Sequence, residues 1–513
     1  MNRYVRVWVA ALALCVSACS SLPPVQDRMA STAFTDTAHT RLGLALAPAL
    51  AQHAGKTGVH ALADPRDAFV ARAVLAAMAD RSIDVQYYIW RGDEAGTMLF
   101  EALWEAAQRG VRVRLLLDDH NTGGLDPTLA ALDAHPNIQV RLYNPVGQRA
   151  VRAINYLTDF SRVNRRMHNK SFTVDNQMSV VGGRNIGDEY FGAGRGMVFA
   201  DLDVTLVGAA VQQVSLEFDT YWNSASAYCA ADLLRRGTAA DVQALQARFS
   251  ANRSSQEAKD YLEAVRASPL ARRLLDRTFA FEWTTARILW DDPAKTLGTE
   301  ARRDDLMFPR LIESLGRPDK RLDIVSPYFV PGEQGTASLS AMARRGVEVR
   351  ILTNSLASSD ASVVHAGYAK RRADLLRGGV RIYELKPTAV EARDTDRGIG
   401  SSASTGLHAK TFAVDGERIF VGSFNLDPRS LLLNTEMGVV LESPRLAQAL
   451  SAGFATTVPG VAYEVRLGED GFNLVWIEQT PDGPKTHTTE PGTTWLQRTG
   501  VTVLSVLPIE WLL

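Results

Sequence analysis

The chain contains two copies of one pattern, about 240 residues apart, and this duplication constrains its fold more than any other feature. Residues 80–119 and residues 319–355 each hold an apolar segment, an aromatic pair, a glycine-containing loop, an amphipathic segment, Arg-Gly-Val and a second apolar segment. Later, Arg141-Leu142-Tyr143 recurs as Arg381-Ile382-Tyr383. Strands that alternate with helices in each copy predict an α/β fold with helices covering the sheets.

Each copy also carries a shorter and more specific motif. Residues 167–185 and 407–425 both fit His-x-Lys-x(4)-Asp-x(6)-Gly-[Gly/Ser]-x-Asn. On a strand, the histidine and the lysine two positions later point to the same face. The shared residues are His168, Lys170, Asp175, Gly182 and Asn185 in the first copy, and His408, Lys410, Asp415, Gly422 and Asn425 in the second.

This doubled motif resembles that of the phospholipase D superfamily. The resemblance implies a duplicated α/β fold in which two α-β-α sandwich halves face each other across one active-site cleft. One histidine would attack phosphorus and the other would protonate the leaving oxygen, without a metal or another cofactor. By resemblance, His168 of the first copy is the nucleophile and His408 is the general acid. The expected phosphate-binding residues, besides the two lysines, are Asn185, Asn425, Gly183 and Ser423.

Carboxylates are expected to orient the two histidines. Aligning the segments downstream of the motifs pairs Asp201 with Glu436. In the family such acids serve the histidine of the opposite half, and Asp203 is the rival of Asp201 for this role. Asp175 and Asp415 complete the catalytic motif, but the resemblance implies that they fix strand ends through backbone hydrogen bonds.

The N-terminal segment is typical of an export signal. Arg3 and Arg6 precede an apolar run, and small residues lead to Cys19. Residues 1–18 are therefore expected to be a lipoprotein signal peptide, with Cys19 lipidated; a plain signal peptide is the alternative. The other cysteines, Cys15 and Cys229, then leave no disulfide framework. Ser20 after Cys19 favours, by resemblance to bacterial lipoproteins, an outer-membrane anchor facing the periplasm.

The remaining boundaries follow from the repeat. Residues 19–58 are expected to be a tether, 59–300 the first half with a helical insertion at 230–280, and 301–460 the second half. Residues 285–290 are expected to rejoin the sheet of the first half. Residues 461–513 predict a hairpin region packed on the body, in which core packing is favoured over membrane docking for Trp476, Trp495 and Trp511. Both motifs lie in one chain, so a monomer is expected, and the need for an accessory protein is left open.

Charge and further resemblances bear on the substrate. With 56 basic and 57 acidic residues the chain has a net charge of −1, which gives no general attraction to nucleic acid. Residues 182–191, 424–430 and 507–513 resemble the cardiolipin synthase C group. That resemblance implies a transfer through phosphohistidine that forms cardiolipin from phosphatidylglycerol and a second phospholipid, phosphatidylethanolamine or phosphatidylglycerol. The alternatives are a phospholipase D that yields phosphatidic acid and a phosphodiesterase or nuclease.

Overall fold

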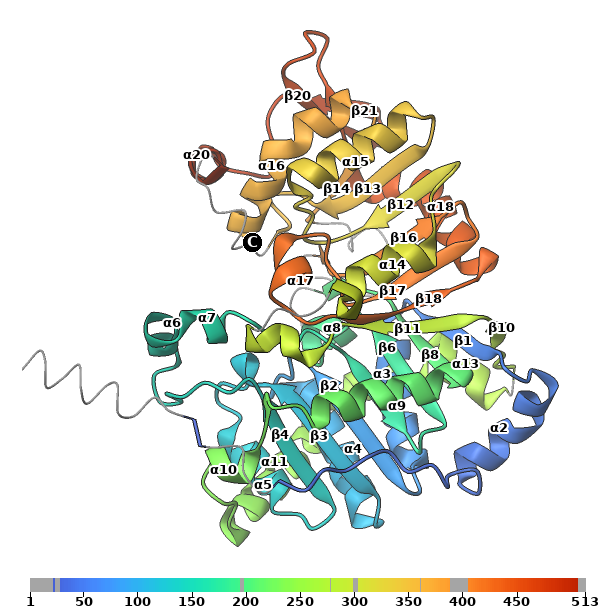
Figure 1. Ribbon diagram of the computed structural model, residues 1–513, viewed down its shortest axis with the longest axis vertical. Coiled ribbons are helices and arrows are strands. Elements are labelled where there is room, and N and C mark those ends of the chain that lie inside the picture. Colours follow the sequence, from blue (N-terminus) through green and yellow to red (C-terminus); the bar gives the residue numbers. More distant parts are fainter. Residues whose placement is uncertain are drawn as a thin grey trace, which may run out of the picture.

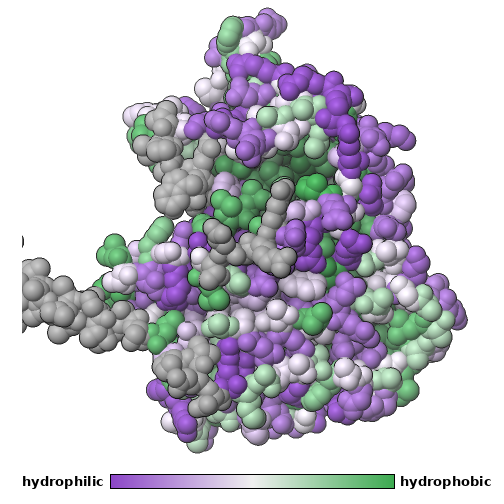
Figure 2. Space-filling view, viewed as in Figure 1, coloured by the Kyte–Doolittle hydropathy of each residue, from purple (hydrophilic) through white to green (hydrophobic). Residues whose placement is uncertain are grey.

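The computed structural model describes residues 22–23, 28–193, 198–276, 278–298, 303–359, 361–387 and 405–505. The expected signal peptide, Cys19 and Trp511 lie outside the described residues. Two sheet-containing halves are stacked one above the other (Figure 1), and the surface is hollowed between them (Figure 2). Within the described parts of the chain, no helix is both long enough and apolar enough to span a bilayer.

The first half is built on a nine-stranded sheet in the order β10-β1-β8-β6-β5-β2-β3-β4-β9. Strands β2, β3 and β4 run parallel to one another, and the other pairings are antiparallel. Its strands are β1 (Thr57–Leu62), β2 (Ser82–Tyr87), β3 (Arg112–Asp118), β4 (Ile138–Tyr143), β5 (Ser171–Val174), β6 (Met178–Gly182), β8 (Asp203–Gly208), β9 (Ala227–Cys229) and β10 (Glu282–Thr284). Its helices include α3 (Pro65–Met78), α4 (Glu94–Gln108), α5 (Asp126–Asp133), α8 (Asp188–Phe191) and α9 (Ala209–Trp222).

The second half repeats this arrangement in a ten-stranded sheet, in the order β11-β18-β17-β16-β12-β13-β14-β19-β20-β21. The run β17-β16-β12-β13-β14 matches β6-β5-β2-β3-β4, so the sequence duplication is a duplication of topology. Its strands are β11 (Ala286–Trp290), β12 (Arg321–Val325), β13 (Glu348–Asn354), β14 (Arg381–Leu385), β16 (Lys410–Val414), β17 (Arg418–Gly422), β18 (Met437–Leu441), β19 (Ala462–Leu467), β20 (Leu474–Thr480) and β21 (Gly483–His487). Its helices include α14 (Met307–Leu315), α15 (Gly332–Arg344), α16 (Ser362–Arg377), α17 (Pro428–Leu432), α18 (Pro444–Thr456), α19 (Val458–Val461) and α20 (Trp495–Ser505).

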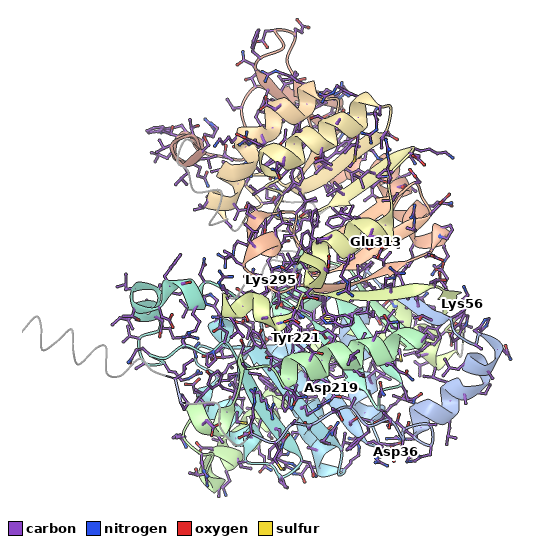
Figure 3. All side chains as sticks on the ribbon, in the orientation of Figure 1. Asp36, Lys56, Asp219, Tyr221, Lys295 and Glu313 are labelled. Carbon is purple, nitrogen blue, oxygen red and sulfur yellow. The ribbon has the colours of Figure 1, made fainter. Side chains whose placement is uncertain are left out.

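The two halves share a buried contact. One hydrophobic cluster contains Val204 and Leu206 from the first sheet and Val421 and Val439 from the second. Polar groups add to it, because the Tyr221 hydroxyl donates to the backbone oxygen of Asp291 at 2.6 Å. Figure 3 labels Tyr221 on α9, close to this contact. A two-stranded parallel ladder, β7 (Val198–Ala200) with β15 (Thr405–Leu407), also joins the halves. The halves therefore form one body.

The chain crosses from the first sheet to the second earlier than expected. Strand β10 pairs with β1 of the first sheet, but β11 pairs with β18 of the second, from Ala286 opposite Leu441 to Trp290 opposite Met437. The prediction that residues 285–290 rejoin the first sheet is therefore wrong. The apolar pattern marked a buried strand, but both sheets offer it an antiparallel neighbour, so the pattern could not choose between them.

The segment between β9 and β10 is helical in its described residues. Its helices cover α3, α4 and α5 and bury Phe249, Tyr261 and Leu270 in the core of the first half. The Tyr261 hydroxyl donates to the backbone oxygen of Phe191 at 3.1 Å, which ties the segment to α8. The helices are α10 (Ala230–Leu233), α11 (Ala239–Ser254), α12 (Gln256–Arg266) and α13 (Pro269–Leu275).

The N-terminal end of the described chain packs more closely than a tether would, and at the C-terminal end β20 and β21 pair as a hairpin that continues the second sheet. Arg28 donates to the backbone oxygens of Asn223 and Ala227, and helix α2 (Arg41–Gln52) is capped by the buried Thr40. The segment expected to be a tether is therefore attached to the first half from Arg28 onward. At the other end Trp476 is buried, whereas Trp495 on α20 is 65% exposed, so the expectation of core packing is wrong for Trp495.

Asp175 and Asp415 each hold the start of a strand. Asp175 accepts hydrogen bonds from the backbone N–H groups of Asp80, Arg81 and Ser82 at 2.8–3.0 Å. Asp415 does the same for Asp319, Lys320 and Arg321. Both aspartates have positive φ, 52° and 55°, a conformation that Asp and Asn tolerate better than most residues.

We expect Asp175→Ala to lower the free energy of unfolding by about 2–4 kcal/mol, because three backbone N–H groups lose the buried, charged acceptor that they share. The control Asp175→Asn keeps one acceptor oxygen and tolerates the same φ, so its loss should be smaller. Urea unfolding measures both variants, and turnover per folded molecule should change little. Equal stability of the alanine variant and the wild type would contradict this role.

Candidate active site

Each motif begins against the opposite half of the molecule. The backbone N–H of His168 donates to the backbone oxygen of Thr435, the residue directly before Glu436, at 2.8 Å. The His408 N–H donates to the backbone oxygen of Ala200 at 2.9 Å, directly before Asp201. Each histidine is therefore bonded through its backbone to the residue that precedes an acid of the other copy, which places the two side chains next to each other.

The two histidines make matching contacts through Nδ1. His168 Nδ1 lies 2.8 Å from Glu436 Oε2, and His408 Nδ1 lies 2.6 Å from Asp201 Oδ2. A carboxylate only accepts hydrogen bonds, so Nδ1 carries the proton in each neutral ring. The lone pair is then on Nε2, the atom available for attack or for proton transfer.

The surroundings of the two acids differ. Burial raises the pKa of Glu436, whose carboxylate accepts hydrogen bonds from the hydroxyls of Ser423 and Ser430. Burial also acts to raise the pKa of Asp201, but His408 and Lys410 outweigh it and hold that pKa below the ordinary value. Asp201 therefore keeps its negative charge more firmly than Glu436 does.

Burial and nearby positive charge govern the bases as well. Burial and the two motif lysines lower the pKa of His168 well below its ordinary value. Burial and Lys410 lower that of His408 to about 4, against the opposing effect of Asp201. Burial lowers the pKa of Lys170 as well. Both lysines donate to a backbone oxygen of the motif, Lys170 to that of His168 and Lys410 to that of His408.

The residues expected to bind phosphate have unequal surroundings. Asn185 already donates to the Tyr190 hydroxyl at 3.1 Å, whereas Oδ1 of Asn425 is a buried atom without a hydrogen-bond partner among the described residues. Gly183 lies against Asp201, since a Cβ there would be 2.5 Å from Asp201 Oδ1. The hydroxyl of Ser423 is occupied, because it donates to Glu436 and accepts from the Met437 N–H. This differs from the expected phosphate contact, and Ser423 instead supports the acid.

Asp203, the rival of Asp201, is occupied elsewhere. Its carboxylate lies 2.8 Å from Arg72 and 3.3 Å from Arg184, in a fully buried ion-pair group. Asp203 is the first residue of β8 and is held by these two arginines, whereas Asp201 lies just before the strand, where it meets His408.

Two residues near the motifs were not singled out from the sequence. Asp118 Oδ2 accepts from the Met167 N–H at 2.8 Å, and Asn354 Oδ1 accepts from the Leu407 N–H at 2.9 Å. They end β3 and β13 and fix the residue that precedes each histidine. The signal was present, since Asp118 and Asn354 are 236 positions apart, the same offset that separates Gly110 from Gly346.

A cavity elsewhere on the described surface lies apart from this site. A surface cavity of about 420 Å³ lies between α16 and α20, and none of its lining residues belongs to either motif. In the part of the chain that the structure describes, no group of three or more His, Cys, Asp or Glu side chains is arranged to hold a metal ion.

Comparison with known proteins agrees with the duplicated motif. The family model of the phospholipase D-like domain of cardiolipin synthase matches residues 74–222 and 311–458. The chain is 48% identical to cardiolipin synthase C of Escherichia coli K12 over 92% of this chain and 100% of that protein. It is 25% identical to a cardiolipin synthase of Staphylococcus aureus over 77% of this chain and 66% of that protein.

The fold has a solved counterpart. The phosphatidylserine synthase of Haemophilus influenzae Rd KW20 superposes with a TM-score of 0.54, at 14% identity, over 90% of this chain and 96% of that one. This likeness concerns the fold alone. The family match in both halves and the 48% identical E. coli relative show that the chain belongs to the phospholipase D superfamily, in its cardiolipin synthase family of the C type.

Proposed function

We propose that the protein is a phosphatidyltransferase that forms cardiolipin by two successive displacements at one phosphorus atom. The observation that carries the proposal is the pair of histidines, each held through Nδ1 by a carboxylate of the opposite half. Two such bases in one site can divide a difficult displacement into two easier steps. The family membership and the name of the E. coli relative support the lipid substrate.

In the first step Nε2 of His168 attacks the phosphorus of the donor lipid. A P–N bond forms, the bond from phosphorus to the head-group oxygen breaks, and that oxygen takes a proton from His408. In the second step the free hydroxyl of phosphatidylglycerol gives its proton to His408 and attacks phosphorus, which breaks the P–N bond. Lys170, Lys410 and Asn425 would stabilise the negative charge on the non-bridging oxygens.

The difference between the acids supports this division of roles. A carboxylate that stays charged stabilises a protonated imidazole beside it. Asp201, with its lowered pKa, opposes the effect of burial and Lys410 on the pKa of His408 and so favours the acid role for that histidine. Glu436, with its raised pKa, gives less support to a positive charge on His168, which favours the neutral nucleophile.

The donor is phosphatidylethanolamine or a second phosphatidylglycerol in this proposal. Lipidation of Cys19 would hold the protein on the cell envelope beside these lipids, facing the periplasm and favouring the outer membrane. Since one chain supplies both histidines and both acids, a monomer can carry out the reaction.

The test is to identify lipid products by mass spectrometry. The full-length protein is incubated with phosphatidylglycerol, with and without phosphatidylethanolamine, and His168→Ala is the blank. We expect cardiolipin that is missing from the blank, and dependence on phosphatidylethanolamine would identify the donor. Phosphatidic acid alone would make the protein a hydrolase, and no lipid turnover would redirect the search to other phosphodiesters, including nucleic acid.

A further inference from the structure

We propose that one side of the molecule, beside the active site, docks on the surface of a lipid bilayer. The proposal rests on the proposed function, because it concerns how that site reaches lipid substrates. The surface involved, the docking rim, is formed by the short helix η2 (Arg152–Ile154) with the preceding Val151, α6 (Asn155–Thr158), α7 (Phe160–Val163), the short helix η3 (Pro293–Leu297) and α17. Its exposed apolar residues are Val151, Leu157, Phe160, Leu297 and Leu432.

These elements adjoin one another although they are far apart in the sequence. Arg165, just after α7, donates to the backbone oxygen of Lys295 in η3 at 3.0 Å. Lys295 donates to the backbone oxygen of Ser430 in α17 at 2.8 Å, and Arg429 donates to that of Asn164 at 2.7 Å. Figure 1 shows α6 and α7 projecting on the left, below α17, and Figure 3 labels Lys295 between them and the second half.

The large apolar side chains of the rim are exposed to solvent. Leu157 is 87% exposed, Val151 and Leu432 are each 61% exposed, and Leu297 is 52% exposed. Figure 2 shows hydrophobic surface at the projecting tip where α6 and α7 lie. Large apolar side chains that are gathered on adjoining elements mark an interaction surface, and a bilayer interface lowers the free energy of such side chains.

The rim is connected to the active site by a short series of contacts. The Tyr156 hydroxyl of α6 lies 2.8 Å from Nδ1 of His120. The ring of His120 stacks on Tyr88 at 6.4 Å between centroids, and Tyr88 meets the His168 ring edge to face at 5.0 Å. The rim is therefore separated from the nucleophile by only three side chains, those of Tyr156, His120 and Tyr88.

The expected anchor would hold a bilayer on this side. Arg28 contacts Ala227, and the neighbouring Ser226 hydroxyl lies 3.3 Å from that of Thr296, next to Leu297 of the rim. Cys19 is nine residues before Arg28, so an extended chain reaches roughly 30 Å. A lipid on Cys19 would therefore keep the membrane within that distance of Arg28, on the side of the molecule where the rim lies.

A second exposed group lies across the hollow between the halves. Helix α20 exposes Trp495 and Leu496, at 65% and 64%, and Figure 1 shows α20 on the same side as α6 and α7. Tryptophan favours the boundary between lipid and water. A bilayer that touches both groups would cover the opening between the two halves.

The test compares one enzyme on two forms of the same substrate. The full chain with Val151→Glu and Leu157→Glu acts on vesicles of equal parts phosphatidylglycerol and phosphatidylethanolamine, or on dihexanoyl lipids dissolved as monomers. We expect at least about a tenfold loss of cardiolipin formation on vesicles, because charged residues oppose insertion, and an unchanged rate on monomers. The matched control, Leu216→Glu with Leu275→Glu, changes two exposed leucines on α9 and α13, away from the rim.

Each outcome decides a separate question. Equal losses on vesicles and monomers would mean damage to the fold or the site, and would overturn the docking role, as would an unchanged rate on vesicles. A similar vesicle-specific loss in the control would overturn the location of the surface. If the wild-type protein turned over neither form of lipid, the proposed function would fail instead of the docking rim.

Discussion

His168→Ala is expected to reduce cardiolipin formation by about 10³-fold or more. The variant lacks the atom that forms the P–N bond. Catalytic residues that act as a unit lose nearly all of their rate enhancement when one of them is removed. His408→Ala should be about as damaging on natural lipids, because the departing alkoxide then lacks its proton donor. Product formation by mass spectrometry measures both losses.

The two histidines can be distinguished by changing the leaving group. In a phosphatidyl donor that carries 4-nitrophenol, the leaving group is nitrophenolate, which departs without needing a proton. The His408→Ala variant should therefore still release nitrophenol and retain phosphorus on the protein. His168→Ala should do neither. Peptide mapping of the trapped adduct locates the phosphorus, and an adduct on His408 in the His168→Ala variant would reverse the two roles.

Glu436→Gln is expected to lower the rate by about 10²–10⁴-fold while His168 remains in place. The charged acceptor that holds the Nδ1–H tautomer is replaced by a neutral amide, and its NH₂ group must face either the histidine or one of the serine hydroxyls that donate to Glu436. The loss of tautomer control leaves geometry nearly intact but removes much of the catalytic effect.

A double variant tests whether Glu436 acts through His168. Glu436→Gln added to His168→Ala should cause little further loss, because the partner that it orients is already missing. A full additional loss in the double variant would mean that Glu436 has a separate role. Thermal unfolding of each variant accounts for changes in the folded fraction, since Glu436 is fully buried.

The duplication and the motif residues could be recognised without coordinates because they are repeats in the chain. The offset of 240 residues identifies His168 with His408 and Asp175 with Asp415. The capping role of the two aspartates came from the resemblance and not from a local pattern, because the N–H groups that each one binds lie about 95 residues earlier in the chain. Local periodicity also marked the strands and the helical segment after β9.

Other features depended on which parts of the chain meet in space. Whether β11 joined the first or the second sheet was open, since its apolar pattern suits either one. The occupied hydroxyl of Ser423 also followed from tertiary structure, because Glu436 reaches it across the β17–β18 pair. Asp118 and Asn354 were visible as a matched pair in the repeat, but only the fold brings them to the residues before the histidines.

The sequence alone therefore determined that this protein has two copies of one α/β unit, each with a histidine, a lysine and an asparagine in fixed order. Hydrogen bonds within a few residues and side-chain periodicity are encoded locally, so a repeat reveals them. The resemblance implied that each acid serves the histidine of the opposite half, and the tertiary structure gives the contacts themselves: His168 Nδ1 with Glu436, and His408 Nδ1 with Asp201. Such pairs depend on packing between segments more than 200 residues apart, and no local pattern specifies that distance or orientation.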